Sequence, residues 1–188
     1  MKRLEKSPKA LTILRATSGF TLIELLVVIG IIAILAVLIT LAINPAEMQR
    51  KGRDAARLAD MTGLRKAIDL SITDGKVLQG TLTTSYSHDS TQTRTASSLT
   101  NYVGMDVSKY VSILPVDPRQ TATAVTVISD GLTQVAAGAM RYDFSSNGQY
   151  YEINTYLESV DNNDKALNDG GNSATKYEIG TFPGLSLL

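Results

Sequence analysis

SGFTLIELLVVIGIIAILAVLITLAI, residues 18–43, is the stretch that determines how the rest of the chain is organised. Its 19 residues from 25 to 43 include no charged side chain, and only Gly30 and Thr40 are not plainly apolar. As a helix this part is roughly 28 Å long, about the thickness of the hydrocarbon core of a bilayer. Because it is apolar on every side rather than on one face, it is predicted to be a transmembrane helix.

The charged residues beside this stretch predict its orientation. Residues 1–19 carry five Lys or Arg against Glu5, a net charge of +4, so this end is expected to stay in the cytoplasm. Glu24 lies one residue before the uncharged run, where a carboxylate is costly unless something pairs with it, and is therefore a candidate functional residue. No small-x-small signal cleavage site follows the run; the small residues Ser18 and Gly19 precede it instead.

The string GFTLIE at residues 19–24, behind a basic leader and ahead of the long apolar run, resembles type IV prepilins and type II secretion prepseudopilins. In that family a membrane aspartyl peptidase, the prepilin peptidase, cuts after the glycine and N-methylates the new first residue. The resemblance implies cleavage between Gly19 and Phe20, N-methylation of Phe20, and a role for Glu24 in assembly. The alternative is an uncleaved signal-anchor helix, which explains neither the glycine nor the position of the glutamate.

Composition allows one modest domain in addition to the anchor. Without residues 1–19 the chain has a net charge of −4, which argues against general affinity for nucleic acid. The chain has no cysteine and one histidine, so disulfides are excluded and a zinc site is not expected. There is no Gly-rich phosphate loop and no pairing of a histidine with a nucleophile, so the sequence does not predict an enzyme.

Asn44 and Pro45 end the apolar segment. Pro45 lacks an N–H and its ring crowds the carbonyl of Leu41, so the helix is predicted to kink or break here. The same residues are also typical of a new helix start, with Asn44 as N-cap and Pro45 at the first helical position. In the family that the chain resembles, filaments are thought to loosen near such a proline, so the resemblance implies an assembly hinge.

Residues 20–44 are therefore expected to be the transmembrane and assembly helix, and residues 45–74 an amphipathic helix that ends at about Thr73. Its apolar stripe, at spacings of three and four, consists of Leu58, Met61, Leu64, Ile68 and Ile72. The opposite side is expected to carry the charged residues, including the basic cluster of residues 50–57. Two interpretations of that cluster remain open: a site for anionic lipid heads, DNA or an acidic neighbour, or a solvated face just outside the membrane.

Residues 75–120 are expected to form a loop followed by an extended connector. Twelve of the 20 residues 81–100 are Ser or Thr, too polar to build a core, so a surface loop is predicted, either bare or O-glycosylated. Residues 110–118 contain Pro115 and Pro118 and are predicted to be extended. The string LPVDP at 114–118 resembles the corresponding segment of major pseudopilins, although the Trp-Gly-x-Pro-Tyr that often follows there is absent.

Residues 121–158 are predicted to form an antiparallel sheet. The segment 121–129 is rich in Val and Thr, and segments 140–144 and 150–158 flank a hairpin turn at 145–149. Alternation in the last segment places four residues on the face toward the helix: Tyr151, Ile153, Thr155 and Leu157. The fold class is therefore α+β, a pilin-like roll in which a long N-terminal spine helix, half transmembrane and half amphipathic, packs on a small antiparallel sheet.

Residues 159–188 are expected to contain an Asx- and Gly-rich loop and a last strand at 176–181. The loop supplies hard oxygen donors of the kind that Ca²⁺ binds, and the major pseudopilins that the chain resembles carry calcium in their C-terminal loop. The spacing does not fit an EF-hand, and an ordinary Asx-rich turn is the alternative. No other cofactor is predicted, and the candidate calcium ligands are Asp161, Asn163, Asp164 and Asp169.

Together these observations predict a pilin or pseudopilin of a type IV pilus, competence pilus or type II secretion filament. The subunit is expected as a single-pass inner-membrane protein with its head outside the cytoplasm, and then in an extracellular or periplasmic filament. Its expected partners are the prepilin peptidase, identical or related subunits, the inner-membrane assembly platform and the membrane; nucleic acid is expected only if residues 50–57 bind it. The alternative is a monomeric signal-anchored surface protein whose head binds a ligand or senses the surface.

Overall fold

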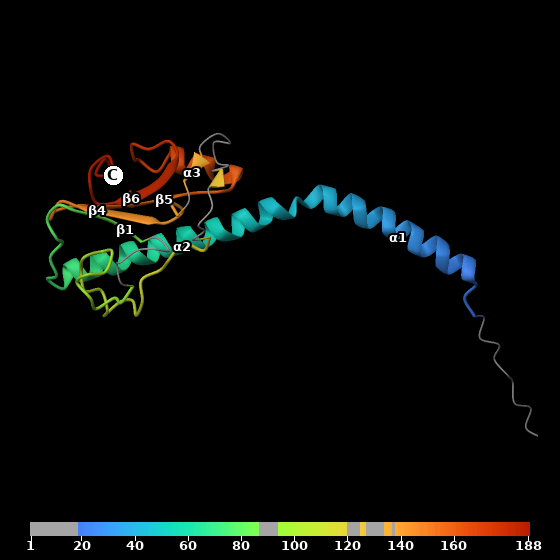
Figure 1. Ribbon diagram of the computed structural model, residues 1–188, viewed down its shortest axis with the longest axis horizontal. Helices are drawn as coiled ribbons and strands as arrows, with labels where there is room; N and C mark the ends of the chain where they lie inside the picture. Colours follow the sequence, from blue (N-terminus) through green and yellow to red (C-terminus); the bar gives the residue numbers. More distant parts are fainter. Residues whose placement is uncertain (1–18, 87–93, 120–124, 127–133, 137) are drawn as a thin grey trace, which may run out of the picture. The chain divides into compact units, whose positions relative to one another are not determined.

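The computed structural model describes residues 19–86, 94–119, 125–126, 134–136 and 138–188 (Figure 1). It divides into two compact units, residues 1–44 and 45–188. The predicted α+β class is confirmed, because a long N-terminal helix is followed by a small four-stranded antiparallel sheet. Nearly all of the predicted leader, His88 and most of the predicted strand 121–129 lie outside the described residues.

Helix α1, Leu22–Ile43, is the helix that the structure describes in the first unit. Its segment Leu22–Thr40 is long and apolar enough to cross a membrane, with a mean hydropathy of 3.2. Every side chain described in α1 is exposed. Such a surface needs lipid or another protein to cover it, because exposed apolar area of this extent is unfavourable in water.

Helix α2, Pro45–Thr73, has the bounds that the apolar spacing predicts. Its buried face differs from the predicted stripe, since Leu58 is only half-buried and Ile72 is 37% exposed. The stripe continues toward the N-terminus with two charged residues instead of apolar ones. At spacings of three and four, the buried positions are Asp54, Arg57, Met61, Leu64, Ile68 and Ser71.

The sheet of the second unit has the strand order β1-β4-β5-β6 and is antiparallel throughout. The strands are β1 (Leu82–Tyr86), β4 (Tyr142–Ser146), β5 (Tyr151–Tyr156) and β6 (Lys176–Gly180). The predicted hairpin joins β4 to β5, and the Asn147 side chain accepts hydrogen bonds from the backbone N–H groups of Gln149 and Tyr150 at 3.0 and 2.8 Å. A further short pair joins β2 (Val125–Thr126) to β3 (Gln134–Val135).

The core lies between α2 and the sheet. Phe144, Ile153 and Ile179 pair across β4, β5 and β6 and face the buried side of α2. The connector, residues 94–118, completes this core and passes close to α2 in Figure 1. Its buried apolar side chains are Ala96, Tyr102, Val103, Met105, Val107 and Leu114.

The prediction that residues 81–100 form only a surface loop is wrong in two places. Leu82–Tyr86 is strand β1 at the edge of the sheet, and Ala96 is fully buried. A strand rich in Ser and Thr can join a sheet because its ladder consists of backbone hydrogen bonds, and hydroxyl pairs such as Thr83 with Ser145 add to it.

The sheet face away from α2 is also buried, which the alternation in β5 does not predict. Glu152, Asn154 and Glu178 lie on this face with at most 1% of their area exposed. The C-terminal residues reach this face: the backbone N–H of Leu187 donates to Glu152 at 2.7 Å. The predicted loop 159–172 also contains two short helical turns, η1 (Val160–Asn162) and α3 (Asn163–Leu167).

Candidate functional site

The predicted cleavage position lies in a non-helical, exposed segment before α1. Gly19 and Phe20 have no regular secondary structure, and Phe20 is 83% exposed. Thr21 is the N-cap of α1. A peptidase can bind the chain only in an extended form, so the position of the bond between Gly19 and Phe20 ahead of the first helical turn suits cleavage.

Glu24 closes a capping box with Thr21. Its carboxylate accepts hydrogen bonds from the backbone N–H of Thr21 at 2.8 Å and from the Thr21 hydroxyl at 2.7 Å, and the Glu24 N–H donates to that hydroxyl at 3.3 Å. The uncut chain therefore satisfies this carboxylate by itself. The spacing T-x-x-E is the usual signature of such a cap, so Thr21 could have been predicted as the partner of Glu24.

The junction of the two helices has an unusual backbone. Asn44 is the C-cap of α1 with φ 43° and ψ 76°, in the left-handed region, and Pro45 is the first residue of α2. A left-handed residue interrupts the helical path, and asparagine adopts that conformation more readily than most residues. The proposed role of Asn44 and Pro45 as an assembly hinge stays a prediction.

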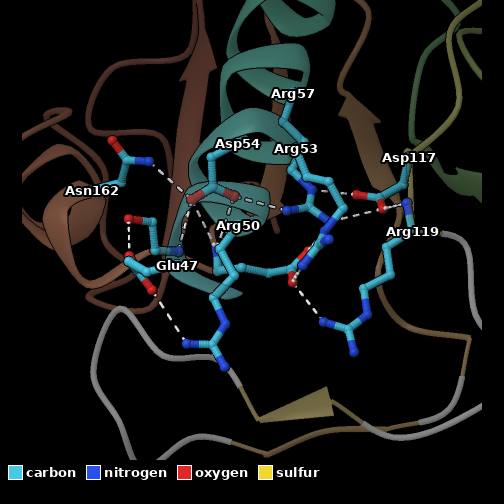
Figure 2. A network of polar contacts seen from close by, with 10 residues as sticks. Glu47, Arg50, Arg53, Asp54, Arg57, Asp117, Arg119 and Asn162 are labelled. Atoms are coloured by element: carbon cyan, nitrogen blue, oxygen red, sulfur yellow. Dashed lines mark hydrogen bonds and ion pairs between the residues drawn. The ribbon is translucent and has the colours of Figure 1, made fainter. Parts of the chain in front are cut away.

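A buried arginine organises the second unit (Figure 2). The Arg57 side chain is fully buried and donates to three carboxylates: Asp117 through Nε at 2.6 Å and Nη2 at 3.0 Å, Asp54 through Nη1 at 2.8 Å, and Glu158 through Nη2 at 2.7 Å. The two-pronged contact with Asp117 uses the planar fork that only a guanidinium offers. Arg57 thus joins α2 to the connector and to the end of β5.

Asp54 receives hydrogen bonds from the chain that follows β5. The backbone N–H groups of Glu158 and Ser159 donate to its carboxylate at 2.8–3.1 Å, and the Asn162 side-chain amide donates at 2.9 Å. A buried carboxylate is tolerable only when its oxygens are paired in this way. Asp54 therefore fixes the path of residues 158–162 against α2.

Glu158 is the third carboxylate that pairs with Arg57. Burial alone would raise its pKa, but the guanidinium groups of Arg53, Arg57 and Arg119 overcome this effect and lower the pKa to about 2. Arg53 binds it through two nitrogens at 2.9 and 2.6 Å, and Arg119 contacts it at 2.6 Å. Glu158 therefore stays ionised throughout the ordinary pH range.

The network changes the interpretation of the basic cluster at residues 50–57. Arg53 and Arg57 hold carboxylates of their own chain, and Lys51 forms an ion pair with Asp161. The interpretation as a solvated basic face is therefore wrong for Arg57, which is buried, and for Arg53, which is mostly covered, whereas Lys51 stays exposed beside an exposed partner. Positive and negative groups balance in number around α2: Arg50, Lys51, Arg53, Arg57 and Arg119 against Glu47, Asp54, Asp117, Glu158 and Asp161. This balance does not favour DNA or anionic lipid as a ligand.

Asp117 gives the string LPVDP a structural role. Besides holding Arg57, its carboxylate accepts the backbone N–H of Arg119 at 2.8 Å. Pro115 fixes the extended path ahead of it, and its carbonyl accepts the Tyr102 hydroxyl at 2.9 Å. The string LPVDP therefore holds the Asp117 carboxylate where it binds the Arg57 guanidinium.

Residues 14–43 match the family model of the prokaryotic N-terminal methylation motif. The chain has a prepilin-type N-terminus. The match covers Gly19, Phe20, Glu24 and all of α1, and fits the prepilin and pseudopilin family, whose members are structural subunits. The motif implies processing by prepilin peptidase and assembly with pilin subunits, and together with α1 it indicates membrane anchoring. Comparisons with curated proteins and with solved structures found no match.

The four predicted calcium ligands do not come together around one point. Asp161 pairs with Lys51, and Asp169 accepts backbone N–H groups of Gly171 at 2.8 Å and Glu178 at 2.7 Å. Asn163 and Asp164 begin α3. In the described parts of this prepilin-type chain, no three His, Cys, Asp or Glu side chains are placed to hold a metal ion. The arrangement of Asp169 is an Asx turn, the alternative interpretation.

Glu178 is a buried carboxylate with an unusual protonation. Its Oε2 accepts the Ser173 N–H at 2.9 Å, whereas its Oε1 has no partner among the described residues. Burial raises its pKa to about 7, the negative charges of Glu152 and Asp169 act in the same direction, and the Ser173 N–H opposes them. The sequence contains no signal for this, because the burial of Glu178 comes from the loop before β6, in which Gly171 and Ser173 lie against its side chain.

Replacing Glu178 by glutamine is expected to stabilise the prepilin-type chain at about pH 8 and to change little at about pH 5. Between its unfolded pKa and about 7 the folded state binds more protons, so this group lowers stability as pH rises through that range. Glutamine copies the neutral form, and the gain at high pH is on the order of 1–3 kcal/mol. Urea unfolding of the detergent-solubilised chain, followed by tyrosine near-UV circular dichroism at both pH values, measures this effect.

Glu158→Gln is the matched control, since the same substitution removes a carboxylate whose pKa is lowered. It is expected to destabilise the chain at about pH 8, because Arg53 and Arg119 lose the carboxylate that pairs with them and Arg57 loses one of its three carboxylates. An equal effect of Glu178→Gln at both pH values, or a loss of stability at about pH 8, would contradict the protonation of Glu178.

Proposed function

We propose that the chain is a pilin or pseudopilin subunit, cut after Gly19, N-methylated at Phe20 and assembled through α1 into the filament of a type IV pilus, a competence pilus or a type II secretion system. The observation that carries the proposal is the methylation motif on a helix whose described side chains are all exposed. A processed N-terminus and an uncovered apolar helix are what such a filament requires.

The helix α1 supports two successive environments for the subunit. Its apolar surface suits lipid before assembly, with the head outside the cytoplasm as the basic leader predicts. In a filament the same surface would contact the α1 helices of neighbouring subunits. The driving force is then close packing of the apolar side chains, because transfer from lipid to protein gains no hydrophobic energy.

Glu24 is proposed to act when the subunit leaves the membrane for the filament. Cleavage gives Phe20 a positive amine, which is as costly in apolar surroundings as the Glu24 carboxylate. The amine of a neighbouring subunit is the proposed partner, so that the pair sets the axial register of assembly. Before that step the hydrogen bonds from Thr21 satisfy the carboxylate within the subunit.

Gly19→Val is expected to block processing almost completely. A β-branched residue crowds the peptide bond that the peptidase must bind, and glycine is the one residue without a side chain there. Immunoblots of membranes should show only precursor-sized protein. Gly30→Ala, in the middle of α1 where an added methyl meets no atom within 4 Å, is the control and should be processed normally.

Mature-sized protein accumulating from Gly19→Val would contradict the proposed function. The chain would then be a signal-anchored protein whose head acts without assembly.

A further inference from the structure

Four side chains on three adjacent strands lie on the sheet face away from α2. Asp143 of β4 pairs in register with Asn154 of β5, and Asn154 pairs with Glu178 of β6. Lys176, two residues before Glu178, lies on the same face. The alternation of the three strands therefore directs an amine, a carboxamide and a carboxylate toward one another.

The contacts among these groups are short. The Lys176 Nζ lies 3.1 Å from Oδ1 of Asn154 and 3.2 Å from Oδ2 of Asp143. The other oxygen of Asp143 accepts from Arg141 Nε at 2.7 Å, which orients the carboxylate. Tyr156 lies below the amine, with its ring centroid 5.3 Å from Nζ, and the Lys176 side chain is only 21% exposed.

Asn154 is buried, and of the two polar atoms of its side chain only the oxygen has a hydrogen-bond partner among the described residues. It is 1% exposed, and its Nδ2 has no hydrogen-bond partner among the described residues. A buried amide nitrogen without an acceptor is unfavourable. Loss of that nitrogen would therefore remove an unsatisfied group, whereas Oδ1 already faces the amine.

We propose that Lys176 and Asn154 join in an intramolecular amide bond, formed by the folded protein itself, which links β5 to β6. Asp143 takes a proton from the Lys176 ammonium, and the neutral Nζ attacks Cγ of Asn154. A second proton passes from Nζ to Nδ2 as the bond from Cγ to Nδ2 breaks, so that nitrogen leaves as ammonia, and the ammonia then takes the proton held by Asp143 and becomes an ammonium ion. One lysine ammonium and one carboxamide thus give one secondary amide and one ammonium ion, with no change of oxidation state.

The fold supplies what this reaction needs. Because the fold holds the amine and the amide in contact, the reaction is intramolecular rather than bimolecular. This removes a large part of the activation barrier that two separate molecules would face. Glu178, directly across from Asn154, holds a proton up to about neutral pH because burial raises its pKa to about 7. It therefore adds little negative charge where the carbonyl oxygen becomes negative.

The amide bond would close a covalent loop in the chain, which here cannot be closed by a disulfide. Residues 155–175 lie between the joined side chains and contain η1 and α3, and the chain has no cysteine. A covalent link across this segment restricts the unfolded chain in the way a disulfide does. It would hold the C-terminal residues over the buried face of the sheet.

Tryptic mapping of the full, detergent-solubilised chain tests the proposal. Trypsin cuts after Arg141 and Lys165, and an amide at Lys176 prevents cleavage there. The expected product is a branched peptide of residues 142–165 joined to residues 166–188, lighter than the sum of the two by one ammonia. The intact protein should be lighter, by the mass of one ammonia, than the mass calculated from its sequence and its N-terminal processing.

Two variants separate this bond from other events. Lys176→Arg keeps the positive charge beside Asp143 but cannot form the amide, so the branched peptide and the mass deficit should both disappear. Lys165→Arg, at an exposed position of α3, should retain them. Separate peptides 142–165, 166–176 and 177–188 from the wild type would overturn the proposal. An ammonia deficit without the branched peptide would overturn it too, because a succinimide at Asn147 produces that mass alone.

Discussion

Arg57→Met is expected to destabilise the second unit by about 3–5 kcal/mol, the cost of removing one partner from a buried ion network. Methionine has a suitable length for the space but leaves Asp54, Asp117 and Glu158 without the guanidinium that neutralises them. Arg53 and Arg119 still compensate Glu158, whereas Asp117 loses both prongs of its contact. Urea unfolding at neutral pH, with tyrosine near-UV circular dichroism as the signal, measures the loss.

The control is Arg65→Met, on the same helix and with its own acidic neighbour. Arg65 is 47% exposed and lies 3.7 Å from Asp69, so its removal is expected to change stability by less than about 1 kcal/mol. Arg57→Lys should fall between the two, because one ammonium cannot reproduce the fork that binds Asp117. If Arg57→Met cost no more than Arg65→Met, the network would not be the element that holds the connector and residues 158–162 to α2.

The second large effect is expected from Glu24→Gln, which should reduce assembled filament about tenfold or more while leaving insertion and cleavage intact. Glutamine also serves at the third position of a capping box, so the start of α1 should persist. The amine of Phe20 in a neighbouring subunit would, however, face a neutral group in apolar surroundings. Leaving one charge of such a pair unpaired costs more than the 1.4 kcal/mol that corresponds to a factor of ten.

Filament sheared from the surface, compared at equal cellular protein, measures this effect. Thr21→Val is the matched control: it removes the hydroxyl of the cap but keeps the Glu24 carboxylate, so assembly should fall far less than in Glu24→Gln. Wild-type amounts of filament from Glu24→Gln would exclude the proposed intersubunit pair and leave the carboxylate as a cap of its own helix.

Local sequence patterns predicted the elements that depend on local physics. The uncharged run predicted α1, Pro45 and the recurring apolar residues predicted α2, and the turn at 145–149 predicted the hairpin of β4 and β5. Each of these signals lies within a short stretch of chain. The T-x-x-E capping box at Thr21 is also a local signal, and it can be predicted from the sequence in the same way.

The ion network could not be predicted in this way, because its partners come from separate parts of the chain. Arg57 binds Asp117 and Glu158, which are 60 and 101 positions further along. The spacing of Asp54 and Arg57 did continue the apolar stripe, but their charge indicated the solvent side. This charged face of α2 can be buried because side chains of opposite charge from distant parts of the chain pair with it.

Strand β1 and the buried polar face of the sheet were missed for a related reason. The Ser- and Thr-rich composition of residues 81–100 does not predict that this segment pairs with β4. The pairing depends on the edge of β4, whose backbone groups form hydrogen bonds with β1. Asn154 and Glu178 have polar side chains in strands whose other face is apolar, so alternation assigns them to solvent. Residues 173 and 176 contact them, through the Ser173 N–H to Glu178 and the Lys176 amine to Asn154, and these contacts depend on the whole fold.

Whether this chain is a processed filament subunit can be measured from the mass of its N-terminal peptide in filaments sheared from the cell surface. A peptide that begins at Phe20 and carries one N-methyl group is expected. Protein that retains the Met1 leader, or that is present in the membrane but absent from every sheared filament, would contradict it.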